Sequence, residues 1–118
     1  MWLIKLGISD FKSTLDLQKR LWQMRVDGVL PDSLILVEHP HTITSGKSAR
    51  SEDILVSPEE INLSGVTIYE VERGGEHTYH GPGQLVGYPI IRLDGSRRII
   101  SVFVEKIEEV IIRTLRKL

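Results

Sequence analysis

The chain has no cysteine among its 118 residues. This absence excludes disulfides, thiolate metal sites and a cysteine nucleophile within the chain itself. The sequence also lacks any apolar run of the roughly 18 residues that a membrane span needs. Its N-terminus has a short apolar run with one lysine, Lys5, and lacks the layout of a signal peptide. These absences predict a soluble, cytoplasmic protein without a membrane partner.

No excess of charge of either sign is present. The sequence has 15 basic and 16 acidic residues, which gives a net charge of −1 and a pI near 6.4. That balance argues against a nucleic-acid binder that relies on a basic surface. Because 118 residues with 41% hydrophobic content suffice for one small packed domain, and no repeat or linker interrupts them, we expect a single domain over residues 1–118.

Local patterns predict helices and strands in mixed order. Strands are expected at 1–8, 34–38, 66–71 and 84–92. A helix is expected from Ser9 or Asp10 to about Asp27, with Gly28 at its end. Ser57 and Pro58 begin a short helix. Apolar positions at helical spacing over 100–118 predict a second long helix, and Asp94-Gly95 predicts a turn before it.

This order indicates an α+β fold (an α/β sandwich) in which helices pack on a mixed, largely antiparallel sheet. The strands at 66–71 and 84–92 are too close in sequence for a helical crossover, so we expect them to pair antiparallel. Pro89 inside the last strand indicates an edge position or a bulge. The apolar helix that ends at Leu118 leads us to expect that more polypeptide follows.

The most unusual segment is RGGEHTYHGPGQLVGYPI at 73–90. Its eighteen positions contain five glycines, two prolines, two histidines, two tyrosines and an arginine. Glycines allow the backbone to approach a ligand closely, and rigid loops of this kind often hold binding groups. We therefore expect a site here.

Two segments resemble the signatures of the lipoyl(octanoyl) transferases. These are LILVEHPHTITSG at 34–46 and RGGEHTYHGPGQLVGYP at 73–89. The resemblance covers essentially the whole chain in collinear order, including the final amphipathic helix. It implies the fold of the biotin- and lipoate-protein ligases. It also implies transfer of an octanoyl group from acyl carrier protein to a lysine of lipoyl domains, those of 2-oxoacid dehydrogenases and the glycine cleavage H protein, without a cofactor or metal.

The resemblance further implies a cysteine that forms an acyl-thioester and a lysine that activates it. In the family both lie beyond the TYHGPG segment. This sequence has no cysteine, and none of its lysines (5, 12, 19, 47, 106 and 117) stands in that context. The chain therefore resembles the N-terminal half of an octanoyltransferase, and we expect it to be inactive alone. It is a truncated piece, one half of a split enzyme or a natural short form, and the first two are favoured.

The resemblance also implies a set of substrate-binding residues: His39, Arg73, Gly74, Gly75, Glu76, His77, Thr78, Tyr79 and His80. His80 is the candidate assisting group, which would orient the acyl carbonyl or donate to the developing oxyanion. The blander interpretations are an arginine that bonds loop carbonyls, glycines that form a turn and structural histidines. The spacing of His39, His41, His77 and His80 also permits a zinc site, which we do not expect because the family uses no metal.

Two other functions stay open. One is a lipoate-protein ligase, which shares the fold but uses ATP. The other is a non-catalytic module that binds an acyl group or a lipoyl domain. For the half-enzyme we expect the segments 38–46 and 73–83 to lie side by side and to face an open groove, with an apolar surface exposed there.

Overall fold

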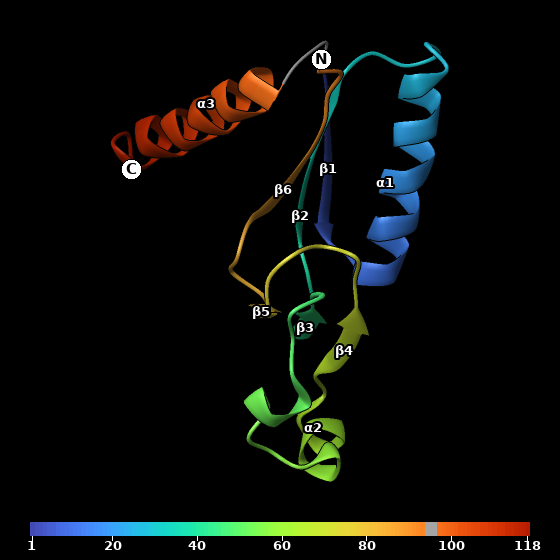
Figure 1. The fold of residues 1–118 in the computed structure, drawn as a ribbon, viewed down its shortest axis with the longest axis vertical. Coiled ribbons are helices and arrows are strands. Elements are labelled where there is room, and N and C mark those ends of the chain that lie inside the picture. The colour runs from blue at the N-terminus through green and yellow to red at the C-terminus, as the bar shows by residue number, and fades with distance from the viewer. Residues whose placement is uncertain (94–96) are drawn as a thin grey trace.

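The computed structural model describes residues 1–93 and 97–118, and for Arg97 and Arg98 it describes the backbone alone. In this part of the chain, three α-helices, a short 3₁₀ helix (η1) and six strands follow one another (Figure 1). Their bounds are β1 Trp2–Ile8, α1 Phe11–Val26, β2 Ser33–Glu38, β3 Thr42–Ser45, η1 Ser51–Asp53, α2 Pro58–Ser64, β4 Thr67–Glu70, β5 His77–His80, β6 Val86–Ile90 and α3 Arg97–Leu115. The predicted turn at Asp94-Gly95 lies outside the described residues.

The larger sheet has the strand order β1-β2-β6 and is covered on one face by α1. β1 runs parallel to β2, and β6 runs antiparallel to it. Alternate residues of β2 point to α1, so Ile35 and Val37 are buried. They form the core with Leu21 of α1 and Ile90 of β6. Burial of each such side chain contributes roughly 1.5–3 kcal/mol to stability. The contact between α1 and the larger sheet is therefore the main hydrophobic core.

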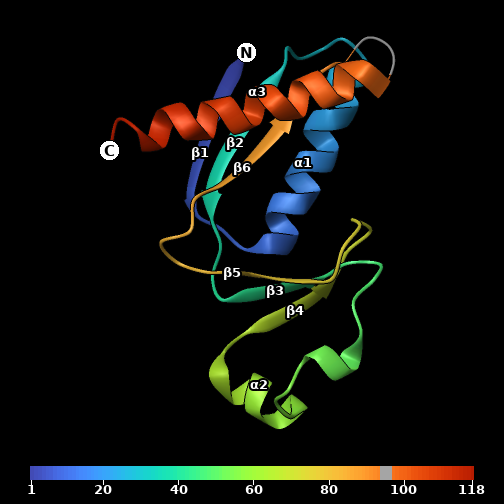
Figure 2. The same ribbon diagram turned by 60° about the vertical axis from the view of Figure 1, so that its left-hand side comes forward.

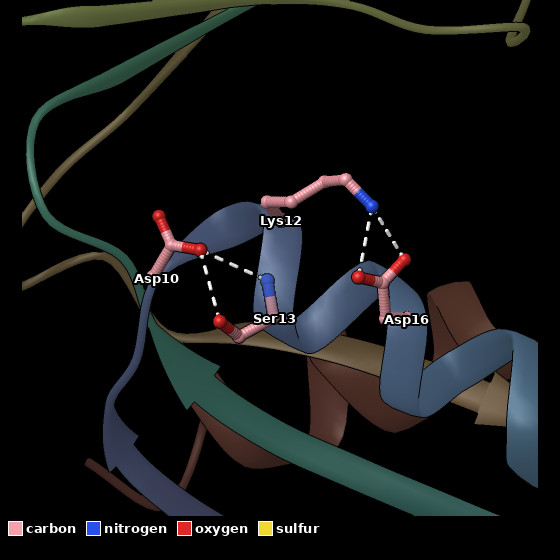
Figure 3. Close-up of polar contacts among 4 residues, drawn as sticks. All are labelled: Asp10, Lys12, Ser13 and Asp16. Atoms are coloured by element: carbon pink, nitrogen blue, oxygen red, sulfur yellow. Dashed lines mark hydrogen bonds and ion pairs between the residues drawn. The ribbon is translucent and has the colours of Figure 1, made fainter.

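The first turn of α1 is fixed by its cap (Figure 3). Asp10 precedes the helix, and its carboxylate accepts hydrogen bonds from the Ser13 backbone N–H at 2.9 Å and from the Ser13 hydroxyl at 3.1 Å. Lys12 and Asp16, one turn apart, form an exposed ion pair at 2.7 Å. The helix ends at Val26, and Gly28 follows with a positive φ of 72°. The predicted start and end of this helix are confirmed.

The smaller sheet has the order β4-β3-β5, with β3 parallel to β4 and antiparallel to β5. The helix α2 precedes β4 and begins as predicted. Ser57 caps it, Pro58 occupies the first turn, and the Glu60 carboxylate bonds back to the Ser57 N–H at 2.8 Å. Gly65, with a φ of 71°, ends it.

The α+β class and the mixed sheet character are confirmed, and the described residues form two parallel and two antiparallel strand pairings. Two details were wrong. The segments 38–46 and 73–83 were expected to be loops, and they contain the strands β3 and β5. The segments 66–71 and 84–92 do not pair, because β4 belongs to the smaller sheet and β6 to the larger one. The intervening segment folds back first as β5 on β3, and the chain then returns to β2. The two sheets are joined by the connections 39–41 and 81–85.

The last helix, α3, extends away from the larger sheet on the side opposite to α1, as Figure 1 and Figure 2 together show. Its apolar residues are largely exposed: Ile99, Ile100, Val102, Val104, Val110, Ile111, Ile112 and Leu115. The structure thus exposes an apolar surface on this helix. The apolar surface expected in front of the segments 38–46 and 73–83 stays a prediction. None of the helices in the described residues has the length and apolar character that crossing a membrane requires.

Candidate functional site

Arg73 is held against the smaller sheet by its guanidinium. One terminal nitrogen, Nη2, donates to the Thr44 carbonyl at 2.8 Å, to the Thr44 hydroxyl at 2.9 Å and to the Thr78 hydroxyl at 2.7 Å. The other, Nη1, donates to the carbonyl of Gly74 at 2.9 Å. Thr44 is buried on β3 and Thr78 stands next to it on β5. These bonds fix the cation in one position above the sheet.

His80 reaches the same hydroxyl from the end of β5. Its Nε2 lies 3.4 Å from the Thr44 Oγ1. Thr44 and His80 belong to the same face of the sheet, since they stand two residues apart in the β3–β5 register. Thr44, Arg73, Thr78 and His80 therefore form one polar group, called the Thr44 cluster below. Arg73 and His80 are brought together, as the sequence-based hypothesis of a shared site required.

The environment of His80 favours its neutral form. Burial is the largest cause that lowers its pKa below the ordinary value, and the neighbouring His39 acts in the same direction. A hydrogen bond with Gln84 opposes this shift, and the Arg73 charge adds to it. The Thr44 hydroxyl accepts from Arg73, so its own proton is available to His80 Nε2. That arrangement places the proton of the neutral His80 ring on Nδ1.

His39 is fully buried between the two sheets. Its Nδ1 lies 2.7 Å from the Ser9 carbonyl and its Nε2 lies 2.9 Å from the Tyr88 hydroxyl. A carbonyl can only accept, so Nδ1 carries the proton, and in the neutral ring Tyr88 donates to Nε2. Burial raises the pKa of Tyr88, which keeps its hydroxyl protonated. The ring of His39 is thus held at both nitrogens, 5.9 Å from that of His80.

Phe11, at the start of α1, is the centre of the contact between the sheets. Its ring stands 5.4 Å from His39, 6.2 Å from His80 and 5.2 Å from Tyr69 of β4. Tyr69 also donates to the Asp10 carboxylate at 3.1 Å. These aromatic contacts place the N-terminal end of α1 directly against the Thr44 cluster.

The glycines of the segment 73–83 permit a close backbone contact. The N–H groups of Gly46, Lys47 and Ser48 donate to carbonyls of the segment 73–76, each at 3.0 Å. A β-carbon built on Gly46 would collide with the Gly75 carbonyl. Gly75 has a φ of 83°, whereas Gly74 is exposed with no neighbour near its missing β-carbon. The prediction that 38–46 and 73–83 lie side by side is confirmed.

The remaining motif residues point elsewhere. His77 lies on the opposite face of β5 from His80, where Nε2 donates to the Arg50 carbonyl at 2.9 Å. Tyr79 is half exposed and bonds His41 at 2.6 Å. Glu76 is exposed and accepts from Gly46 through its carbonyl. The histidines therefore do not converge, and the described residues contain no group of three or more side chains able to hold a metal.

Sequence reasoning missed the polar partners. Thr44 lies within a segment that carries the resemblance, and its position on an alternating strand could have indicated that it faces inward. Tyr88 lies within the strand predicted at 84–92, and nothing in the local sequence indicates its bond to His39. Glu38 ends the strand predicted at 34–38, and its carboxylate accepts from the Gly83 N–H at 2.7 Å, which fixes the Gly81–Gly83 turn. The groove expected in front of the two loops stays a prediction.

The sequence matches the family described as the lipoyl protein ligase A/B catalytic domain over residues 10–118. The chain belongs to this family. Among its relatives are two proteins named octanoyltransferase. That of Syntrophobacter fumaroxidans is 45% identical over 114 residues, which cover 97% of this chain and 50% of the relative. That of Caldicellulosiruptor bescii is 47% identical over 111 residues, or 94% of this chain and 49% of the relative. The resemblance stated from the motifs is confirmed.

Solved structures of the lipoyl protein ligase fold confirm the architecture. A putative lipoate protein ligase of Thermoplasma acidophilum superposes with a TM-score of 0.71 at 17% identity, over 99% of this chain and 48% of that one. A second structure is described as a bi-partite lipoate protein ligase with its E2 lipoyl domain from the same organism. It gives a TM-score of 0.71 over 99% of this chain and 45% of the other. The chain spans about half the length of the relatives that it matches.

Proposed function

We propose that this chain supplies the acyl-binding half of an octanoyltransferase, which moves an octanoyl group from acyl carrier protein to a lysine of a lipoyl domain. The observation that carries the proposal is the Thr44 cluster. It holds the Arg73 guanidinium and the His80 imidazole on a single hydroxyl, at the centre of the segment that defines the family resemblance. The octanoyltransferase relatives support the choice of acyl group.

The cluster is suited to stabilise charge on an acyl carbonyl. Arg73 is held by four hydrogen bonds, so it needs no reorganisation when negative charge develops nearby. His80 is held neutral by its surroundings, and its single N–H, which also bonds Gln84, is the donor it offers to an acyl carbonyl. Its hydrogen bond to the carbonyl oxygen strengthens as that oxygen becomes an oxyanion. Gly74 and Gly75 let the acyl thioester approach the backbone beside Arg73.

The nucleophile has to come from polypeptide other than these 118 residues, because they contain no cysteine. In the reaction that the resemblance implies, a cysteine thiolate attacks the octanoyl thioester and the thiol of the carrier protein leaves. The lysine amine of the lipoyl domain then attacks the enzyme thioester. The cysteine thiol leaves, and an amide forms. No cofactor is consumed.

An ATP-dependent lipoate-protein ligase is the second candidate, because the superposable structures are described as lipoate protein ligases. The two reactions differ in the donor. A transferase takes the acyl group from a thioester, whereas a ligase activates a free acid with ATP. The donor requirement therefore separates the two candidates directly.

A chimera tests the proposal. Residues 1–118 would be joined to the remaining half of the Caldicellulosiruptor bescii octanoyltransferase, and the product incubated with octanoyl-acyl carrier protein and an unmodified lipoyl domain. Mass spectrometry should show one octanoyl group added to the lipoyl domain without ATP. A folded chimera that fails with the thioester but acts on free octanoate with ATP would establish the ligase instead. A folded chimera inactive with both donors would refute both enzymatic functions.

A further inference from the structure

The two ends of the segment 45–50 are bonded to a single side chain, the imidazole of His77. The Ser45 hydroxyl lies 3.0 Å from Nδ1 of this ring, and the Arg50 carbonyl lies 2.9 Å from Nε2. A carbonyl can only accept, so in the neutral ring the proton lies on Nε2 and Ser45 donates to Nδ1. The ring therefore closes the segment 45–50 into a loop, which together with His77 is called the clasp below.

The clasp surrounds the turn that carries Arg73. Inside it, the N–H groups of residues 46–48 donate to carbonyls of the segment 73–76, each at 3.0 Å. One of these acceptors is the carbonyl of Arg73 itself, which is bonded by Lys47. A β-carbon on Gly46 would lie 2.9 Å from Arg73 Nη1, so the guanidinium passes directly beside the clasp. The clasp therefore holds the backbone of Arg73 and borders its side chain.

His77 lies behind the guanidinium and not on its side of the sheet. Arg73 Nη2 bonds Thr44 on β3 and Thr78 on β5. Ser45 and His77 are the strand neighbours of these two threonines and oppose each other in the register. Adjacent residues of a strand point to opposite faces. His77 thus closes the clasp on one face of the smaller sheet, while the Thr44 cluster occupies the other face.

We propose that His77 is a positioning residue for acyl transfer. By joining Arg50 to β5 it keeps the clasp closed, and the closed clasp holds Arg73 where its guanidinium meets the acyl carbonyl. A displacement of about 1 Å can cost about a hundredfold in rate, so this support acts on catalysis without a substrate contact. The role of Arg73 rests on the proposed function, whereas the clasp rests on its hydrogen bonds alone. His77 therefore has a role other than the substrate contact expected from the sequence.

The two bonds of His77 contribute unequally. Ser45 is already held by the sheet, since it belongs to β3 and its carbonyl accepts from the Val71 N–H at 2.9 Å. Within the described residues, Arg50 bonds no strand residue other than His77, because its remaining partners are Glu52 and Asp53. The bond from Nε2 to the Arg50 carbonyl is therefore the one that closes the clasp. It uses the backbone of residue 50 and leaves the side chain there free to change.

Two substitutions separate these bonds. In His77→Gln the side-chain amide nitrogen takes the place of Nε2 and keeps the bond to the Arg50 carbonyl. In His77→Asn the shorter amide reaches only the place of Nδ1 and keeps the bond to Ser45. His77→Leu keeps neither bond. We therefore expect glutamine to preserve the clasp and asparagine to behave like leucine.

Nuclear magnetic resonance of the Arg73 guanidinium in the free chain tests the clasp. Four hydrogen bonds restrain its Nη groups, so they should rotate slowly about the bonds to Cζ. The rotation should be about tenfold faster in His77→Leu and His77→Asn, and within about twofold of the unchanged rate in His77→Gln. His41→Leu is the matched control, because it removes another histidine bond, to Tyr79, and should leave the rate unchanged. Circular dichroism verifies that each variant is folded.

The chimera tests the effect on the reaction. His77→Leu should lower kcat for octanoyl transfer by about tenfold and leave KM for octanoyl-acyl carrier protein within about twofold, because the substrate does not touch residue 77. His77→Gln should restore kcat. A residue that only stabilises the fold would show no such split between kcat and KM, and no rescue by glutamine alone.

The outcomes distinguish the two proposals. Slow rotation of the Arg73 groups in a folded His77→Leu chain would overturn the clasp, whatever the chimera does. Equal effects of glutamine and leucine would overturn it as well, and a raised KM would assign His77 to the substrate instead. Faster rotation in His77→Leu, together with an inactive but folded unchanged chimera, would support the clasp and refute the proposed function.

Discussion

Gly46 lies against the carbonyl oxygen of Gly75, so close that a β-carbon on Gly46 has no room. The nearest obstacle is a backbone oxygen. It cannot easily move aside, because the N–H groups of residues 46–48 bond the carbonyls of the segment 73–76. We expect Gly46→Ala to lower the free energy of unfolding by about 1–3 kcal/mol, since the two segments must separate. Urea unfolding followed by circular dichroism measures this change.

Gly74→Ala is the control for this substitution. A β-carbon on Gly74 meets no atom nearby, and its φ is not positive. This variant should unfold within about 0.5 kcal/mol of the unchanged chain. An equal decrease in the free energy of unfolding for both variants would show that the contact between Gly46 and Gly75 is not the cause of the destabilisation.

Tyr88→Phe removes the hydroxyl that satisfies His39 Nε2. His39 is fully buried, so its nitrogen would be left without a partner. The expected loss is about 1–2 kcal/mol in the free energy of unfolding. Tyr79→Phe removes a hydroxyl that bonds His41 at the surface, and we expect less than about 0.5 kcal/mol there. A Tyr88→Phe variant as stable as the unchanged chain would contradict the assigned hydrogen bond.

Stability should fall on mild acidification because of His80. Its pKa is lowered from the ordinary 6.5, mainly by burial, so the unfolded chain takes up the proton at higher pH than the folded chain does. The His80 contribution is therefore complete above pH 6.5 and is lost as the pH falls from 6.5 toward the folded pKa. Urea midpoints between roughly pH 8 and pH 5 should show this decline, and His80→Asn should flatten it.

Carboxylates act in a different window. Asp10 has its pKa lowered chiefly by the Ser13 N–H, and Asp32 by the Arg25 side chain, both from 3.8. Stability from these groups is present above that value and is lost only as the pH falls below it. The carboxylates therefore do not obscure the His80 effect. A urea midpoint that rises as the pH is lowered from 6.5 toward the folded pKa of His80 would contradict the assigned burial of this ring.

Arg73→Lys tests the cluster in catalysis. A lysine cannot reach Thr44, Thr78 and Gly74 at once, because it lacks the planar fork of donors. In the chimera we expect octanoyl transfer to slow by about ten- to hundredfold through loss of positioning. Arg50→Lys is a matched change at an exposed arginine that pairs only with Glu52 and Asp53 among the described acidic residues. Its rate should be unchanged, and an equal effect of both substitutions would argue against a role for Arg73.

Local elements could be predicted from the sequence because local residues determine them. Asp10 and Ser57 cap their helices by hydrogen bonds within three residues, and Gly28 provides the left-handed residue that follows α1. The edge position of Pro89 follows from its missing N–H alone. The family and its fold followed from the motif, which spans few residues and is rich in uncommon ones.

The division into two sheets could not be predicted, because it depends on pairings between distant segments. Thr44 pairs with Tyr69 on one side and Thr78 on the other, and no local pattern specifies either partner. The site residues divide in the same way. His80 lies on the face of β5 that carries the Thr44 cluster, where Arg73 also binds. His77 lies on the other face, because residues an odd number of positions apart in a strand point to opposite faces.

The segments 39–41 and 81–85, the first of which contains the buried His39, are the only covalent links between the two sheets in the described chain. An insertion in either segment would alter the angle between the two sheets as well as the site. A change in the length of either segment would therefore move His39 and His80, whose rings lie 5.9 Å apart, relative to each other.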